Sequence, residues 1–380
     1  MKQPTLSALA ISLLIAVLVL CTACSSPSKV IKVGLVMPFT GNAATYGQSL
    51  LKGAQLGMDE INAKGGVNGK KLEIVTYDDG GNPSSAATGA QKFADQKDIS
   101  IIVGSALSSS SLAMVPITDK AKLPQLLWSS SSPKLTGISP YVFRMCAQDD
   151  KIARDMVVMM HDTLKANKIV SVYPNVDAGK GVNDTVVKEA AARNMTVLES
   201  ISYLEKDQDF AAVVTKIKEL KPDAVALGGN YTDSALLVKQ ARIAGIKVPM
   251  VGNSGLFSSK FIELGGSDVE GTILILNFLT TNPDPRIQEF DNKFKTKYGA
   301  DPDQYSAIAY DGMYVIAQSA KRAMDKNNGE LSREELRAAL KATNYRGLVG
   351  DTPVTFNDVN NWDRTYVRAV VKNGRFVLYQ

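Results

Sequence analysis

IKVGLVM, residues 31–37, is a short apolar run of the kind that forms a buried strand. A loop rich in Gly, Asn and Thr follows, and residues 50–61, LLKGAQLGMDEI, then place apolar side chains at helical spacing. The helical pattern stops at Gly65 and Gly66, where glycine is expected just past a helix end. A strand, a loop and a helix in this order form the first half of a βαβ unit.

The same unit recurs along the chain. Further strands are predicted over residues 72–77, 99–103, 124–128, 169–173, 197–203, 224–228, 249–252 and 271–278, with helices over 84–95, 112–121, 181–193, 210–219, 233–244 and 259–264. Residues 284–342 are predicted to be mainly helical, and the tail, 352–380, to contain strands with a turn at Asn360-Asn361. Alternating strands and helices indicate an α/β fold, and nearly continuous apolar strands indicate parallel sheets covered by helices on both faces.

Length and charge narrow the class of protein. The chain has 380 residues, too many for one ordinary hydrophobic core, so we expect two lobes with a cleft between them. The composition, 45% apolar and 21% charged, is that of a globular protein. The net charge of +5 comes from charges that alternate in sign along helices, without a basic block, so we expect no nucleic-acid partner.

The first residues predict export. Residues 6–20 are almost wholly apolar and follow a short, weakly basic start, which is typical of a signal peptide. Small residues precede Cys24, and a polar spacer follows it. We therefore expect residues 1–23 to be a lipoprotein signal peptide, Cys24 to be lipidated, and residues 24–29 to be a linker. An ordinary soluble secretory signal and an uncleaved anchor are the alternatives.

The inventory of reactive side chains argues against an enzyme or a metalloprotein. His161 is the single histidine, and Cys146 is the one thiol beyond the signal segment besides Cys24. A zinc site built on His and Cys, and a disulfide within the mature chain, are therefore not expected. A secreted hydrolase remains an alternative, but the chain has no Gly-x-Ser-x-Gly elbow and no second histidine. We expect no cofactor.

Two serine-rich segments follow neighbouring predicted strands. We call residues 104–111, GSALSSSS, and residues 128–133, WSSSSP, the serine segments. Ligands of parallel sheets bind outside the carboxyl ends of the strands, so the two segments are expected to converge. A helix start offers unpaired N–H groups and a partial positive charge, which suit a carboxylate. The alternative is plain capping of the following helix by a serine side chain.

Two tyrosines occupy further loops after strands. Tyr46 lies in the first such loop, and Tyr231 lies in the loop that follows residues 224–228. Aromatic side chains from opposite lobes could close over a ligand between them. The alternative is that each tyrosine simply packs locally.

Several motifs resemble those of the branched-chain amino acid-binding proteins of ABC transporters. They are KVGL at 32–35, TG at 40–41, GA at 53–54, INAKGGVNG at 61–69, YDD at 77–79, PI at 116–117, PQ at 124–125, SSPKLT at 131–136, QAR at 240–242 and AYD at 309–311. The resemblance covers essentially the whole chain after the signal segment. The combination is specific for the family and not for a ligand.

This resemblance implies the type I periplasmic binding protein fold, with two Rossmann-like lobes that have parallel sheets and close on a ligand like a hinge. Three crossings would join the lobes, near residues 144–148, 276–281 and 350–354. The N-terminal lobe would contain residues 30–146 and 279–351, and the C-terminal lobe 147–278 and 352–380.

The resemblance also implies the binding residues. The Ser108 hydroxyl, the Ser129 backbone N–H and the Ser131 hydroxyl would hold a ligand carboxylate, with the aromatic side chains of Tyr46 and Tyr231 beside it.

Two positions depart from the leucine-binding pattern. Ser254 stands where those proteins carry an acidic residue for the ligand ammonium, and Ala178 stands in place of a tyrosine beside the cleft. Because a buried ammonium without an acceptor is costly, either another acid, such as Asp311 or Asp177, supplies the charge, or the ligand has no α-amino group. We count Ser254 and Asp311 among the candidate ligand-binding residues, and we expect a carboxylate-bearing ligand with room for one bulkier than leucine.

The function expected from this resemblance is that of an extracytoplasmic solute-binding lipoprotein of an ABC importer. The partners would be a small amino acid or carboxylate ligand, the ABC permease subunits, and a membrane reached through the lipid anchor. We expect a monomer that catalyses no reaction. The alternative is a ligand-sensing module that acts on a receptor or kinase rather than a transporter.

Overall fold

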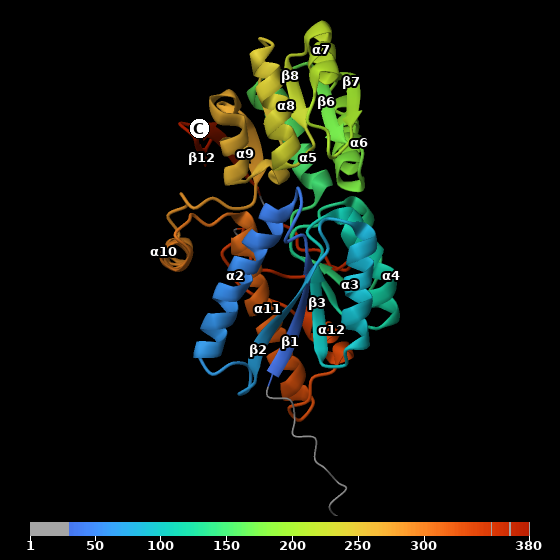
Figure 1. The fold of residues 1–380 in the computed structure, drawn as a ribbon, viewed down its shortest axis with the longest axis vertical. Helices are drawn as coiled ribbons and strands as arrows, with labels where there is room; N and C mark the ends of the chain where they lie inside the picture. The colour runs from blue at the N-terminus through green and yellow to red at the C-terminus, as the bar shows by residue number, and fades with distance from the viewer. Residues whose placement is uncertain (1–29, 351, 365, 380) are drawn as a thin grey trace, which may run out of the picture.

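The computed structural model describes residues 30–350, 352–364 and 366–379. Within them the chain forms two α/β lobes, each built on its own sheet and stacked along the long axis of the molecule (Figure 1). The expected α/β class is confirmed. The predicted signal peptide, the linker and Cys24 lie outside the described residues.

The first lobe contains a wholly parallel five-stranded sheet in the order β2-β1-β3-β4-β5. Its strands are β1 (Val30–Met37), β2 (Lys71–Asp78), β3 (Ile99–Gly104), β4 (Gln125–Leu127) and β5 (Val142–Arg144). Its helices are α2 (Ala44–Ala63), α3 (Pro83–Asp95), α4 (Ser108–Lys120), α10 (Pro285–Tyr298), α11 (Gln304–Lys326) and α12 (Arg333–Lys341). Ser332 caps the start of α12, since its Oγ accepts from the Glu335 amide at 3.2 Å.

The second lobe contains a seven-stranded sheet in the order β12-β11-β10-β9-β8-β6-β7. Its strands are β6 (Lys168–Pro174), β7 (Thr196–Tyr203), β8 (Ala224–Leu227), β9 (Met250–Gly252), β10 (Ile273–Leu276), β11 (Val367–Lys372) and β12 (Arg375–Leu378). Its helices are α5 (Asp149–Val158), α6 (Asp177–Ala191), α7 (Ala211–Leu220), α8 (Tyr231–Ile243) and α9 (Ser259–Gly265). The strands from β6 to β10 run parallel, whereas β11 and β12 add an antiparallel hairpin to one edge.

The packing of α2 against α11 depends on one small residue. A Cβ atom added at Gly53 would lie 2.0 Å from the Ser306 carbonyl oxygen, which belongs to the backbone of α11. Because no real Cβ contact is that short, only glycine allows the two helices to approach this closely. Both helices cover the same side of the first sheet (Figure 1).

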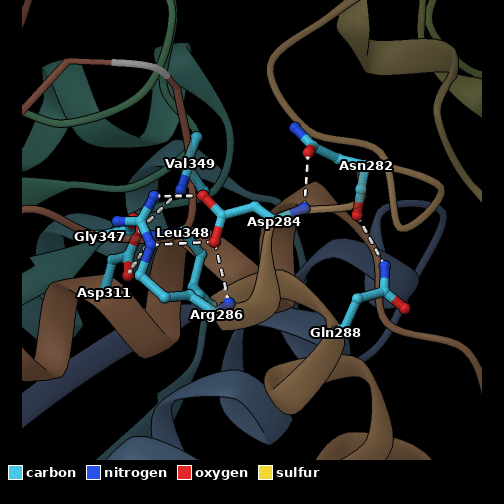
Figure 2. Close-up of polar contacts among 8 residues, drawn as sticks. All are labelled: Asn282, Asp284, Arg286, Gln288, Asp311, Gly347, Leu348 and Val349. Atoms are coloured by element: carbon cyan, nitrogen blue, oxygen red, sulfur yellow. Dashed lines mark hydrogen bonds and ion pairs between the residues drawn. The ribbon is translucent and has the colours of Figure 1, made fainter.

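Three segments of chain pass between the lobes. The first lies between the end of β5 and the start of α5, and the second lies between β10 and α10. Gln288 Nε2 holds the second segment by donating to the Asn282 carbonyl oxygen at 2.7 Å (Figure 2). It also lies 2.9 Å from the Thr280 carbonyl oxygen, to which it donates as well. The third passage differs from the one expected near residues 350–354. Trp362 still pairs with the first lobe, since its amide donates to the Arg144 carbonyl at 3.1 Å, so this passage lies between Trp362 and β11.

The tail contains strands, and a turn closed by the Asn360 amide on the Asn357 carbonyl at 2.9 Å lies next to the predicted position, but this turn does not join the two strands of the hairpin. The turn that joins β11 to β12 lies at Asn373 and Gly374, both with positive φ angles of 53° and 66°. Such a pair suits the two-residue hairpin loop. The Asn360 carbonyl instead accepts from the Arg144 amide at 2.9 Å, and Asn361 forms a parallel bridge with Arg144. The asparagine pair therefore extends the edge of the first sheet.

The sequence pattern also missed α5 and the π-helical turn Met159–Thr163 that continues it. Two charged residues, Asp149 and Asp150, open this helix, and Met159 and Met160 end its apolar face in the core of the second lobe. Because the helix follows an interlobe passage rather than a recognised strand, the alternation of strands and helices did not indicate it. Asp149, the first residue of α5, also contributes to the candidate site.

Candidate functional site

A cavity of about 830 Å³, part of it open to solvent, lies between the lobes. Its first-lobe walls come from the loops after β1, β3 and β4 and from the start of α11, whereas its second-lobe walls come from the loops after β6, β7, β8 and β9. All the strand loops are at carboxyl ends of parallel strands, which is where ligands of such sheets bind. Apolar side chains, including Trp128, Val176 and Ile308, contribute to the wall from both lobes.

The serine segments meet at this cavity, as the order of the strands leads one to expect. Ser129 Oγ donates to the Ala106 carbonyl at 2.6 Å, and the Ser132 amide donates to Ser108 Oγ at 3.2 Å. Behind them the hydroxyls of Ser111 and Ser130 lie 2.7 Å apart. These contacts hold the two segments against each other.

The start of α4 is not capped by a serine. Its N-cap residue is Leu107, whose side chain makes no capping hydrogen bond. The first amides of α4 therefore lack the acceptor that a Ser, Asp or Asn cap would supply. Ser108 and Ser109, the first two residues of the helix, line the cavity. This arrangement favours an anion at the helix start over the alternative of plain capping.

The structure brings five of the seven predicted ligand-binding residues to the cavity: Tyr46, Ser108, Ser129, Ser131 and Ser254. Ala178, the position that departs from the leucine-binding pattern, also lines it. Tyr231 and Asp311 do not. Each of these two has another role that its contacts reveal.

Tyr231 joins the lobes beside the cavity. Its hydroxyl, which comes from the first residue of α8 in the second lobe, donates to the Asn42 carbonyl at 2.8 Å. The same oxygen accepts from the Thr45 amide at 3.3 Å. The ring also packs edge-on against the ring of Tyr46, with centroids 4.8 Å apart. Tyr231 therefore holds the lobes together in the closed arrangement.

Tyr46 crosses the cleft in the opposite direction. Its hydroxyl donates to the Gly255 carbonyl at 2.6 Å and lies 3.3 Å from Asn230 Oδ1. The loop that contains Gly255 is also held from the first lobe, because the Ser254 carbonyl accepts from Gln304 Nε2 at 2.8 Å and from the Tyr305 hydroxyl at 3.1 Å. The described structure is thus a closed one.

Asp311 is fully buried in α11 and supports the backbone behind the cavity. Its carboxylate accepts from the amides of Leu348 and Val349 at distances between 2.8 and 3.0 Å (Figure 2). Arg286 holds the same segment by donating to the Gly347 carbonyl at 2.7 Å. Because its oxygens are occupied by these amides, Asp311 does not offer a charge to a ligand. Burial raises its pKa to about 7.

Asp177, the other acid considered for the ligand ammonium, does not line the cavity. It forms an ion pair with Lys134, which follows the second serine segment. The pair connects α6 in the second lobe to the first lobe. Its charge is therefore already compensated.

Two acids that sequence reasoning passed over do line the cavity: Asp149 and Glu205. Asp149 is buried at the start of α5, hydrogen bonds to the Ser131 side chain, and has its pKa raised by burial to about 7. Glu205 follows β7 and accepts from Asn230 Nδ2 at 2.9 Å. Its position directly after the predicted strand 197–203 is the signal that could have found it, because ligands bind at the carboxyl ends of parallel strands.

The remaining reactive groups at or near the cavity are inert. Cys146 lines it, but burial raises the pKa of its thiol to about 12, and its sulfur donates to the Ser130 carbonyl at 3.0 Å. A thiol with so high a pKa is a poor nucleophile. His161 lies in the π-helical turn Met159–Thr163, away from the cavity lining. Within the described residues no group of three or more His, Cys, Asp or Glu side chains is arranged to hold a metal ion.

None of the helices in the described part of the chain combines the length and apolar character needed to cross a membrane.

Comparison with known proteins agrees with this architecture. The sequence profile of the family described as "Periplasmic binding protein" matches residues 30–375. The Leu/Ile/Val-binding protein homolog 1 of Brucella melitensis biotype 1 is 28% identical over 326 residues, which cover 84% of each chain. Among solved structures, the branched-chain amino acid transporter substrate-binding protein LivJ from Streptococcus pneumoniae, in complex with isoleucine, has a TM-score of 0.83 and 28% identity and covers 91% of this chain and 97% of its own.

A second solved structure, the leucine-binding protein LivK from Thermotoga maritima, has a TM-score of 0.85 and 26% identity, with 92% of this chain and 98% of that chain covered. The similarity therefore extends through both lobes and not through one of them alone. The family profile likewise spans nearly all described residues. This chain belongs to the periplasmic binding protein family.

Proposed function

We propose that this protein is the solute-binding component of an ABC importer, and that it captures an amino acid or a related small carboxylate between its lobes. The main support for the proposal is the position of the two serine segments at the N-terminus of α4. There, helix amides without a capping side chain and the Ser108 hydroxyl lie at the cavity between the lobes. Relatives named for Leu/Ile/Val binding and for complexes with isoleucine support the same class of ligand.

Binding would follow from hinge closure. An open form exposes the serine segments, which take up the carboxylate, and the second lobe then closes through Tyr46 and Tyr231. Charge-assisted hydrogen bonds to the carboxylate, together with burial of an apolar side chain near Trp128, are sufficient for the roughly −8 kcal/mol of a micromolar dissociation constant. Permease subunits would recognise the closed form. No residue of the cavity is needed for a chemical step.

Export and lipid anchoring complete the proposal. The apolar segment 6–20 and the cysteine at position 24 support a lipoprotein held at a membrane surface outside the cytoplasm. Mass spectrometry of the protein purified from a membrane fraction would identify the anchor. An N-terminus at Cys24 carrying acyl chains is the expected result, and an unmodified Cys24 in a chain that retains residues 1–23 would contradict it.

A thermal-shift screen tests the binding function directly. A true ligand stabilises the folded protein by about 2.7 kcal/mol when present at 100 times its dissociation constant. Branched-chain and aromatic amino acids, their deaminated analogues, dicarboxylates and amides form the panel. We expect carboxylates to raise the melting temperature and amides of the same shape to have no effect. Equal stabilisation by acids and amides would rule out the serine segments as an anion site.

A further inference from the structure

The cavity contains an acid that can replace the missing ammonium acceptor. The position that supplies an acid in leucine-type binders is Ser254 here, and the two substitutes considered from the sequence are occupied elsewhere. Asp311 accepts from backbone amides, and Asp177 pairs with Lys134. Whether the ligand carries an amino group therefore depends on the other acids that line the cavity.

Glu205 lines the cavity from the second lobe, just past the end of β7. Its Oε1 atom accepts from Asn230 Nδ2 at 2.9 Å, and no ion pair to this carboxylate occurs within the described residues. Burial raises the pKa of Glu205. The nearby cation that lowers this pKa is Lys206, which is exposed, and its effect is smaller than that of burial. A partly buried carboxylate without a buried cation beside it is stabilised by a positively charged ligand group.

Two further residues of the cavity wall carry acceptor atoms without a donor. Asp149 Oδ2 and Asn277 Oδ1 are buried and have no hydrogen-bond partner among the described residues. Both residues line the same cavity as Glu205. Since an unpaired buried acceptor costs free energy, Asn277 Oδ1 favours a ligand that brings N–H donors, whereas Asp149 belongs to the serine side of the cavity. An ammonium group brings three and a deaminated acid brings none.

Asp149 is the less suitable of the two acids as the principal acceptor. It hydrogen bonds to Ser131 in the serine segments, and the nearby charge of Arg144 lowers its pKa against the effect of burial. It therefore belongs to the side of the cavity where the ligand carboxylate is expected. Glu205 projects from the lobe opposite the serine segments, so a ligand held between the two sides would present opposite charges to them.

We propose that Glu205 is the acceptor for the ligand ammonium, and that the ligand is consequently a zwitterionic amino acid and not a deaminated acid. This inference rests on the proposed binding function. Asn230 positions the carboxylate through its side-chain N–H groups while its own oxygen lies 3.3 Å from the Tyr46 hydroxyl. The acceptor is thus fixed in place when the lobes close.

Isothermal titration calorimetry on the purified lipoprotein in mild detergent tests the assignment. The probes are leucine, isoleucine and phenylalanine, each paired with its deaminated acid: 4-methylpentanoate, 3-methylpentanoate and 3-phenylpropanoate. Hydrogen bonds between charged groups correspond to about a 10- to 100-fold effect, so the wild type should bind the best amino acid at least 10-fold more tightly than its partner acid. Glu205→Gln should lose most of this preference by weakening the amino acid while leaving the acid unchanged or slightly tighter.

Two further variants make the test specific. Glu199→Gln removes a carboxylate from β7, the strand that precedes Glu205. This carboxylate pairs with Lys216 outside the cavity, so the variant should bind every probe with the affinity of the wild type. Asp149→Asn should change the affinity of both members of each pair by the same factor, since it acts on the carboxylate side that they share. Melting temperatures of all variants without ligand show whether each one is folded.

The outcomes of these measurements separate the assignment of Glu205 from the proposed function. Unchanged amino acid affinity in Glu205→Gln, or a selective loss in Asp149→Asn instead, overturns the assignment. A wild type that binds only deaminated acids overturns the assignment but leaves the proposed function standing. A wild type that binds no member of the panel overturns both.

Discussion

Replacing Tyr231 with phenylalanine isolates the free energy of lobe closure. The hydroxyl lies outside the cavity lining, so its removal takes nothing from a ligand. It makes two interlobe hydrogen bonds, at 2.8 Å to the Asn42 carbonyl and at 3.3 Å from the Thr45 amide, and phenylalanine retains the ring contact with Tyr46. All these hydrogen bonds break when the lobes separate.

The size of the effect follows from those two contacts. A neutral hydrogen bond contributes about 0.5–1.5 kcal/mol, and the longer of the two is expected at the lower end, so closure should lose about 1–2 kcal/mol. If the free protein is mostly open, the whole loss falls on ligand affinity, as a roughly 5- to 30-fold increase in the dissociation constant. Most of it should be seen as faster dissociation, because the encounter with the open form is unchanged.

Stopped-flow and calorimetric measurements on Tyr231→Phe, with whichever ligand the thermal screen identifies, give both quantities. Tyr173→Phe is the matched control, since this tyrosine lies in β6 of the same lobe and does not line the cavity. Its affinity should equal that of the wild type. A Tyr231→Phe protein with affinity and dissociation rate within twofold of the wild type would refute the view that this tyrosine holds the lobes closed.

Three other predictions concern the site and the fold. Ser131→Ala should weaken a carboxylate ligand about 10-fold in calorimetry, because a donor on the anion side is lost; unchanged affinity would argue against the serine segments. Gly53→Ala should lower the free energy of unfolding by about 1–3 kcal/mol in urea titrations, since the added Cβ would lie 2.0 Å from the Ser306 carbonyl; full wild-type stability would show that the helices separate easily. Burial raises the pKa of Asp233 and Asp311 to about 7, so each keeps a proton in the folded chain that the unfolded chain releases near pH 4. The free energy of unfolding should therefore fall as the pH rises from about 4 to about 7 and level off above it, whereas a constant or rising value in that range would contradict the prediction.

Controls for the first two of these variants come from neighbouring positions. Ser110→Ala removes a buried hydroxyl that has no hydrogen-bond partner among the described residues and does not line the cavity, so the ligand affinity of this variant should not change. Gly57→Ala acts one turn further along α2, where the added Cβ would lie 3.1 Å from the nearest atom of α11. It should cost clearly less stability than Gly53→Ala.

Much of the architecture could be predicted because it rests on local patterns. Apolar runs such as residues 31–37 and 99–103 mark buried parallel strands, and the helices between them follow from 3.6-residue periodicity. The serine segments could be paired for the same reason, since strand ends of a parallel sheet share one edge. Elements next to the interlobe passages were predicted poorly. α5 and the partners of Asn360 and Asn361 depend on contacts with distant parts of the chain.

Asp311 shows the limit of assigning a charge from a motif. In the sequence it belongs to the family motif AYD at 309–311 and is a reasonable candidate for the acceptor of a ligand ammonium. In the structure its carboxylate is turned to the amides of residues 348 and 349, which lie more than thirty positions away along the chain. Glu205, which no motif marks, is the acid without a buried cation at the cavity wall.

By itself the sequence determined the fold class, the number of lobes and the edge of each sheet where a ligand binds, because these follow from periodicity and from the geometry shared by all parallel sheets. Only the tertiary structure decided which acids face the cavity and which tyrosines join the lobes. A side chain contributes charge to a ligand only if folding leaves that charge uncompensated, and compensation comes from partners that are far away in sequence.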